Sequence, residues 1–160
     1  LMDTGFLPKP EGHAGDDEAA KRMALLQIAK TQGVRAMAQQ WVRGMVHPDF
    51  LGDADLIERV LAMFERKSAD TFERQIRALL TRPDGSDVLR SLNVPTLLMC
   101  GAQDAWSPPA QHEAMQAIMP PALTQFDLIE HAGHMAPMER PAEVAASLLG
   151  WLARCDHFAP

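Results

Sequence analysis

Cysteine is scarce in this chain of 160 residues, which contains only Cys100 and Cys155. The two lie too far apart for a Cys-x-x-Cys redox pair and are too few for a disulfide framework, so a reducing, cytoplasmic environment is expected. No apolar run approaches the ~18 residues of a membrane-spanning helix, and the first residues lack the basic-then-apolar pattern of a signal peptide. We therefore expect no membrane partner.

Basic side chains are in the minority. Fifteen lysines and arginines stand against 21 aspartates and glutamates, which gives a net charge of -6 and an isoelectric point near 5.4. Because an acidic surface repels phosphate backbones, a nucleic-acid partner is not expected. Hydrophobic residues make up 47% and charged residues 22%, which is the balance of a globular protein rather than a disordered one.

Residues 16–85 have the periodicity of short amphipathic helices. We expect four of them, forming a helical layer without a catalytic signature. The clearest stripe follows the i, i+3, i+4, i+7 spacing of one helix face and consists of Val34, Met37, Ala38, Trp41, Val42 and Met45. Met37 and Trp41 are therefore either ordinary core residues or the lining of a pocket for an apolar substrate.

Residues 86–160 predict a β-α-β-α unit with parallel strands. Val94–Cys100 is a continuous apolar run, typical of a strand buried on both faces. A helix from Pro108 to about Met119 follows, with Ala110, Ala114 and Ile118 expected on its inner face. Leu123–Ile129 is the second expected strand. A last helix starts at Pro141 and carries Val144, Leu148, Leu149 and Leu152 on one side.

Residues 1–15 begin with Leu1 and Met2, which have the character of the end of an apolar strand, followed by a loop rich in proline and glycine. Two parallel strands are marginal as a sheet, and apolar strands need neighbours on both sides. We expect the chain to be half of a domain, so that the rest of the sheet lies elsewhere or a second copy pairs with the exposed strand edges.

Two titratable side chains follow the two expected parallel strands. Asp104 comes after the first and His134 after the second, 30 residues later, so both should lie at the edge where open α/β sheets collect their ligand sites. An aspartate there can hold an imidazole in one tautomer and stabilise its protonated form. The simpler alternatives are a turn aspartate that binds local amides and a loop histidine that binds the backbone.

The order and spacing of these motifs resemble the α/β-hydrolase superfamily, and the resemblance extends over essentially the whole chain. The motifs are Gly101-x-x-Asp104-x-x-x-Pro108 and, with six residues between histidine and proline, Gly133-His134 to Pro141. The resemblance implies that residues 86–160 are the C-terminal part of the hydrolase core, that 16–85 form its helical lid and that 1–15 contain the end of a core strand with the entry loop. It further implies that Asp104 is the acid and His134 the general base of a catalytic triad.

One part of the family pattern is missing. The nucleophile should precede the lid, and the sequence contains no Gly-x-Ser-x-Gly motif. We expect the complete enzyme to hydrolyse a small apolar ester or related carbonyl compound without a cofactor, through a serine nucleophile or an aspartate. Without nucleophile and oxyanion donors, this chain alone should be inactive. The alternative is a non-catalytic module for self-association or partner binding.

The remaining candidates are weaker. Trp106 and Met135 follow the expected acid and base and are candidate pocket residues. His131-x-x-His134 with Glu130 lacks a third spaced ligand, so no metal site is expected. The other histidines are expected in loops or on exposed helix faces: His13, His47, His112 and His157.

Overall fold

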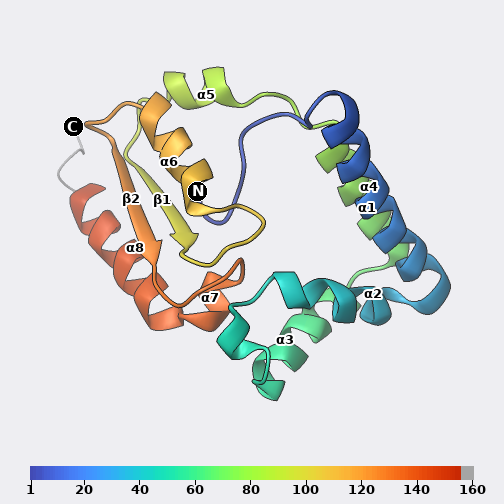
Figure 1. Cartoon of the computed structure of the whole chain (residues 1–160). Helices are drawn as coiled ribbons and strands as arrows, with labels where there is room; N and C mark the ends of the chain where they lie inside the picture. The colour runs from blue at the N-terminus through green and yellow to red at the C-terminus, as the bar shows by residue number, and fades with distance from the viewer. Residues whose placement is uncertain (156–160) are drawn as a thin grey trace. The chain divides into compact units, whose positions relative to one another are not determined.

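The computed structural model describes residues 1–155, which divide into two compact units (Figure 1). The α/β unit contains Leu1–Phe6, Gly44–Phe50 and the chain from Ser86 onward. The helical unit contains Leu7–Arg43 and Leu51–Gly85. The α/β fold expected from the sequence is therefore confirmed, whereas the role of the helical unit as a lid stays a prediction.

The helical unit is built from the four helices that the periodicity predicts: α1 (Gly12–Gln32), α2 (Val34–Trp41), α3 (Ala54–Glu65) and α4 (Ala69–Leu80). Gly33, with a φ of 94°, separates α1 from α2. The side chain of Asp53 caps α3 by accepting from Leu56 N–H, and Ser68 caps α4 by accepting from Thr71 N–H. The core of this unit lies among α1, α2 and α4 and contains Leu26, Ala29, Met37, Phe72 and Ile76. Two short 3-10 helices, η1 (Val42–Gly44) and η2 (Pro48–Phe50), follow α2 in the chain.

Among the residues described, the sheet of the α/β unit has two strands, the first of which is β1 (Thr96–Gly101). β2 (Thr124–Ile129) runs parallel to it, in a register that pairs Thr96 with Thr124 and Gly101 with Ile129. On the other edge, Met2 forms a parallel bridge with Met99, and Leu1 exchanges hydrogen bonds with the backbone of β1. That the first residues are the end of a core strand stays a prediction, since Met2 forms a single isolated bridge. The carboxyl end of β1 consequently lies between Asp3 and the loop after β2.

Helices cover both faces of this sheet (Figure 1). Successive side chains of β1 point to opposite faces: Leu98 joins one core with α5 (Ser86–Ser91) and α6 (Pro109–Ile118), and Leu97 joins another with α7 (Ala136–Glu139) and α8 (Pro141–Cys155). None of the helices described combines the length and the apolar character that a membrane crossing requires.

The inner face of α6 differs from the prediction by about one position. Its buried residues are His112 and Met115, whereas Ala110 and Ala114 are exposed. The sequence pattern allowed either face of the helix to be the buried one, because alanine is nearly as apolar as methionine. The two side chains differ in size, since alanine fills much less space. The larger Met115 packs with Leu98, and it decides which side of the helix is buried.

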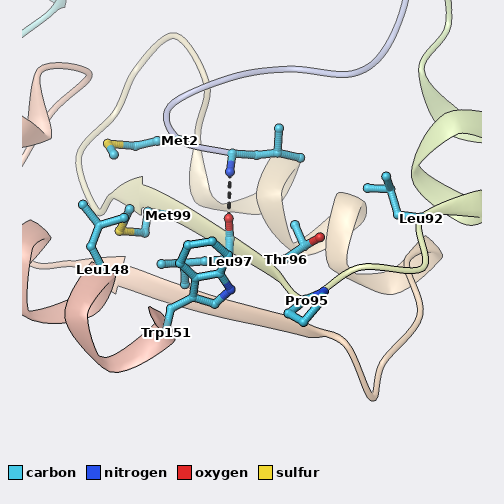
Figure 2. Close-up of a pocket in the computed structure, with 9 residues that line it drawn as sticks. Met2, Leu92, Pro95, Thr96, Leu97, Met99, Leu148 and Trp151 are labelled. Atoms are coloured by element: carbon cyan, nitrogen blue, oxygen red, sulfur yellow. Dashed lines mark hydrogen bonds between the residues drawn. The ribbon is translucent and has the colours of Figure 1, made fainter. Parts of the chain in front are cut away.

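An apolar groove with a volume of about 320 Å³ lies along β1 and α8 (Figure 2). It is lined by Leu1, Met2, Leu92, Pro95, Thr96, Leu97, Met99, Leu148 and Trp151. Of the apolar residues expected on one side of α8, only Val144 is buried, and Leu149 and Leu152 are 67% and 50% exposed. The Nε1 atom of Trp151 is buried without a hydrogen-bond partner among the residues described. We refer to this feature as the β1–α8 groove.

Candidate functional site

The structure brings Asp104 and His134 together beyond the ends of β1 and β2. Nδ1 of His134 lies 2.9 Å from Oδ2 of Asp104. The Asp104 side chain is completely buried, and that of His134 is 23% exposed. This contact orients the imidazole through Nδ1 and leaves Nε2 free of the carboxylate.

The interpretation of Asp104 as a turn aspartate is compatible with its contact to His134, because its two carboxylate oxygens have different partners. Oδ1 accepts hydrogen bonds from the backbone N–H groups of Trp106 (2.8 Å) and Ser107 (2.9 Å), while Oδ2 contacts His134. Burial opposes ionisation of Asp104, but the hydrogen bonds from His134, Ser107 and Trp106 outweigh it, and the pKa of Asp104 is lowered. The carboxylate is therefore charged at neutral pH and accepts the Nδ1–H of His134.

Two glycines allow the loops of the pair to approach each other. A Cβ atom on Gly101 would lie 2.2 Å from the carbonyl oxygen of Gly133, and a Cβ on Gly133 would lie 2.8 Å from the backbone nitrogen of His47. No side chain fits at either distance. The glycines of the two sequence motifs are thus required by close backbone packing around the Asp104–His134 pair.

Glu139 is a functional residue that the sequence reasoning missed. Its carboxylate is buried (7% exposed residue) and accepts backbone hydrogen bonds from His47 (2.6 Å), Gly133 (3.1 Å) and Met135 (3.1 Å). The last two flank His134, so Glu139 holds the loop that presents the imidazole. No spacing rule signals this role, because the acid looks like an ordinary first-turn glutamate before Pro141.

Asp3 is a second carboxylate at the end of β1. It has a positive φ of 45°, and its Oδ1 accepts a hydrogen bond from Gly101 N–H at 3.1 Å. Burial and the nearby negative charge of Asp104 raise the pKa of Asp3 to about 6, against the opposing effect of the Gly101 hydrogen bond. The sequence placed this residue in a loop and assigned it no role.

We expect Asp3→Asn to stabilise the protein at pH 7 by about 1 kcal/mol. The raised pKa means that folded Asp3 holds a proton which the unfolded chain has released, so stability falls as pH rises from about 4 to about 6. The estimate is reduced for solvent screening because Asp3 is only half-buried. Asparagine removes this loss, retains an oxygen for Gly101 and tolerates the positive φ.

The measurement is the free energy of unfolding in urea from pH 4 to pH 7.5. Asp16→Asn, at an exposed position of α1, is the matched control and should leave the pH profile unchanged. If the free energies of unfolding of Asp3→Asn and of the wild type ran parallel over the whole pH range, the raised pKa of Asp3 would be contradicted.

The four candidate pocket residues fall into two pairs. The Trp106 ring lies against the His134 imidazole, with centroids 4.9 Å apart, and Met135 follows His134 in the loop held by Glu139. Met37 is fully buried in the core of the helical unit, and Trp41 packs on Phe64 and Phe72. These contacts fit the core interpretation of Met37 and Trp41, and a role in substrate binding stays a prediction for all four.

One of the other histidines contradicts the expectation of loops and exposed helix faces. His112 is fully buried on α6, where Nε2 accepts from Thr4 N–H and the ring stacks on Phe126. Burial lowers the pKa of His112, so this imidazole is neutral at pH 7. His47 lies in a loop as expected, although it is buried (8% exposed), and His13 is exposed on α1 as expected. His157 lies outside the residues described.

The sequence matches a family model over residues 2–147, and that model describes the alpha/beta hydrolase family. The chain belongs to the alpha/beta hydrolase family. This membership confirms the resemblance on which the expected fold rested. The order of Asp104 and His134 in the chain is that of the acid and the histidine in α/β hydrolases. No curated protein sequence gives a significant match.

Solved structures of α/β hydrolases superpose on nearly all of the chain. A thermophilic esterase from Thermogutta terrifontis is 27% identical with a TM-score of 0.83, over 97% of this chain and 55% of its own. The enol-lactonase from Burkholderia xenovorans LB400 is 16% identical with a TM-score of 0.78, over 96% of this chain and 55% of its own. A carboxylesterase structure from Nitrososphaera gargenis is 18% identical with a TM-score of 0.79, over 99% and 56%. The chain thus spans about 55% of the length of these structures.

Proposed function

We propose that this alpha/beta hydrolase chain carries the acid and the base of a serine-type hydrolase for small apolar esters or related carbonyl compounds. The observation that carries the proposal is the hydrogen bond between His134 Nδ1 and Asp104 Oδ2, formed between loops at the carboxyl ends of adjacent parallel strands. The esterase similarity supports the substrate class.

In the proposed mechanism, Nε2 of His134 accepts the proton of the nucleophile as it attacks the substrate carbonyl, and later donates that proton to the leaving group. Asp104 holds Nδ1–H and stabilises the imidazolium that forms in between. Because the lowered pKa of Asp104 keeps it ionised, it remains a carboxylate throughout the cycle.

We place the nucleophile and the oxyanion donors outside these 160 residues, because the sequence contains no Gly-x-Ser-x-Gly motif. We refer to this chain joined to that nucleophile-bearing segment as the complete hydrolase. Serine is the proposed nucleophile, and an aspartate is the alternative. The helical unit is the proposed lid, and Trp106 and Met135 are the proposed apolar contacts for the substrate.

A second candidate function is self-association of the chain, and the β1–α8 groove favours it. The groove exposes Leu148 and Leu1, and the buried Nε1 of Trp151 lacks an acceptor among the residues described. A second copy that pairs with the free edge beside Leu1 would cover this apolar surface and supply acceptors.

The two functions are separated by assaying the 160-residue chain and the complete hydrolase with p-nitrophenyl esters. We expect turnover that depends on His134 from the complete hydrolase and none from the chain alone, with His134→Ala as the test variant and His13→Ala as the control.

In-frame coding sequence that contains a Gly-x-Ser-x-Gly after a predicted strand would identify the nucleophile. Turnover by the chain alone that His134→Ala abolishes would contradict the assignment of the nucleophile to another segment. Light scattering of the chain measures self-association.

A further inference from the structure

Three potential metal ligands from two distant parts of the sequence meet in the α/β unit. His47 and Asp49 come from the segment Gly44–Phe50, and His131 comes from the loop after β2. One ligand atom from each, an imidazole nitrogen or a carboxylate oxygen, lies within 4.8 Å of the other two. None of the three belongs to the Asp104–His134 pair.

The protein backbone holds this cluster in place. The N–H of His47 donates to Glu139 at 2.6 Å, and the carbonyl of His47 accepts from Phe50 N–H at 2.9 Å, so the turn that carries His47 and Asp49 is fixed at both ends. His131 has a positive φ of 52°, which is uncommon for a residue other than glycine. The ring centroids of His47 and His131 are 5.6 Å apart.

Nδ1 of His47 and the carboxylate of Asp49 lie side by side in this turn. Nδ1 of His47 accepts a hydrogen bond from Asp49 N–H at 3.1 Å, so this nitrogen presents a lone pair. Oδ2 of Asp49 lies 3.7 Å from the same nitrogen. Asp49 and His131 are exposed, so both side chains are free to rotate toward an ion, and water can replace His47 as the partner of the Asp49 amide.

We propose that His47, Asp49 and His131 bind a divalent transition-metal ion of the zinc class. Two imidazoles and one carboxylate suit zinc, cobalt and nickel better than the oxygen-seeking magnesium and calcium ions. Water completes a tetrahedral site. Metal–ligand distances of about 2.0–2.2 Å bring the ligand atoms to about 3.4 Å from one another, a contraction that rotation of the exposed side chains provides.

The bound ion would join the segment Gly44–Phe50 to the loop that presents His134, three residues after His131. Glu139 already links the same two segments through His47 and Gly133. The ion is thus a second connection, on the solvent side of that buried carboxylate. The expected consequence is a higher thermal unfolding temperature with metal, because a ligand of the folded state stabilises it.

The test is titration of the tag-free chain with Co²⁺, followed by visible absorption, and with Zn²⁺, followed by calorimetry and thermal unfolding. The background carries Cys155→Ser and His157→Ala, which remove two other potential ligands of the sequence. Cys100 needs no replacement, because burial raises the pKa of its thiol to about 12. We expect one ion per chain and a tetrahedral cobalt spectrum.

Two conservative variants localise the site. His131→Asn tolerates the positive φ but lacks the imidazole, and Asp49→Asn keeps the size of the side chain but lacks the charge. Each should weaken Zn²⁺ binding at least about tenfold and reduce the thermal shift. His13→Ala is the matched control, because His13 and Asp17 form an exposed pair at 3.9 Å with the same donor types, and it should leave binding unchanged. Absence of binding, or binding that neither variant weakens, would overturn the proposal.

Discussion

Asp104→Asn is expected to lower the kcat of the complete hydrolase for a p-nitrophenyl ester by about 10⁴-fold, with a much smaller change in KM. The amide cannot compensate the charge of the imidazolium, and its NH₂ group competes with Nδ1–H and favours the wrong tautomer of His134. The fold should persist, because the asparagine oxygen still accepts from Trp106 and Ser107 as Oδ1 of Asp104 does. The measurement is steady-state kinetics, with circular dichroism to verify folding.

Asp87→Asn provides the matched control, because Asp87 is an exposed aspartate of the same α/β unit that pairs only with Arg90 in the contacts described. It should retain full activity. If Asp104→Asn folded normally and kept a kcat within a few-fold of the wild type, Asp104 would not be the acid that orients His134.

Glu139→Gln is expected to destabilise the protein by about 3 kcal/mol. The carboxylate accepts from three backbone N–H groups in a buried position, those of His47, Gly133 and Met135. Glutamine replaces one acceptor oxygen by an NH₂ donor, which faces a backbone donor and leaves it unpaired. Urea unfolding at pH 7 measures the loss.

The same substitution at Glu143 is the control, because Glu143 lies close by on α8 and its carboxylate, on a side chain that is 43% exposed, is paired with Arg140. Glu143→Gln should leave the unfolding midpoint nearly unchanged. Loss of the hydrogen bonds that hold the His134 loop should also affect catalysis. Glu139→Gln should lower kcat of the complete hydrolase under conditions where the variant is still folded. Equal stability of the two variants would show that Glu139 does not hold the loop.

The candidate acid and base were predictable from sequence because each follows a strand that its own residues specify. A continuous apolar run predicts β1, a glycine and a proline bracket each of the two loops, and parallel strands place their carboxyl ends at one edge. From these local facts the loops of Asp104 and His134 are expected to be neighbours. The bounds of both strands differ from the predicted ones by two residues or fewer.

Other features depended on contacts between residues far apart in the chain. The inner face of α6 was predicted wrongly, because packing against Leu98 selected Met115 and His112 over the alanines. The sequence predicts no metal site because the segment around His131 has no third spaced ligand, and the metal site that we propose depends on His47 and Asp49, which lie more than 80 positions away in the chain.

The amino-acid sequence by itself determined the class of fold, the order of its elements and the placement of Asp104 and His134 after two adjacent parallel strands, since these follow from periodicity and from the glycines and prolines that mark the loops. Only the tertiary structure decided which polar groups surround and support Asp104 and His134. The buried carboxylate of Glu139 and the raised pKa of Asp3 exist because folding removes both groups from water beside distant backbone amides and charges. Burial and long-range proximity have no local signature in a sequence, so these roles became visible only in three dimensions.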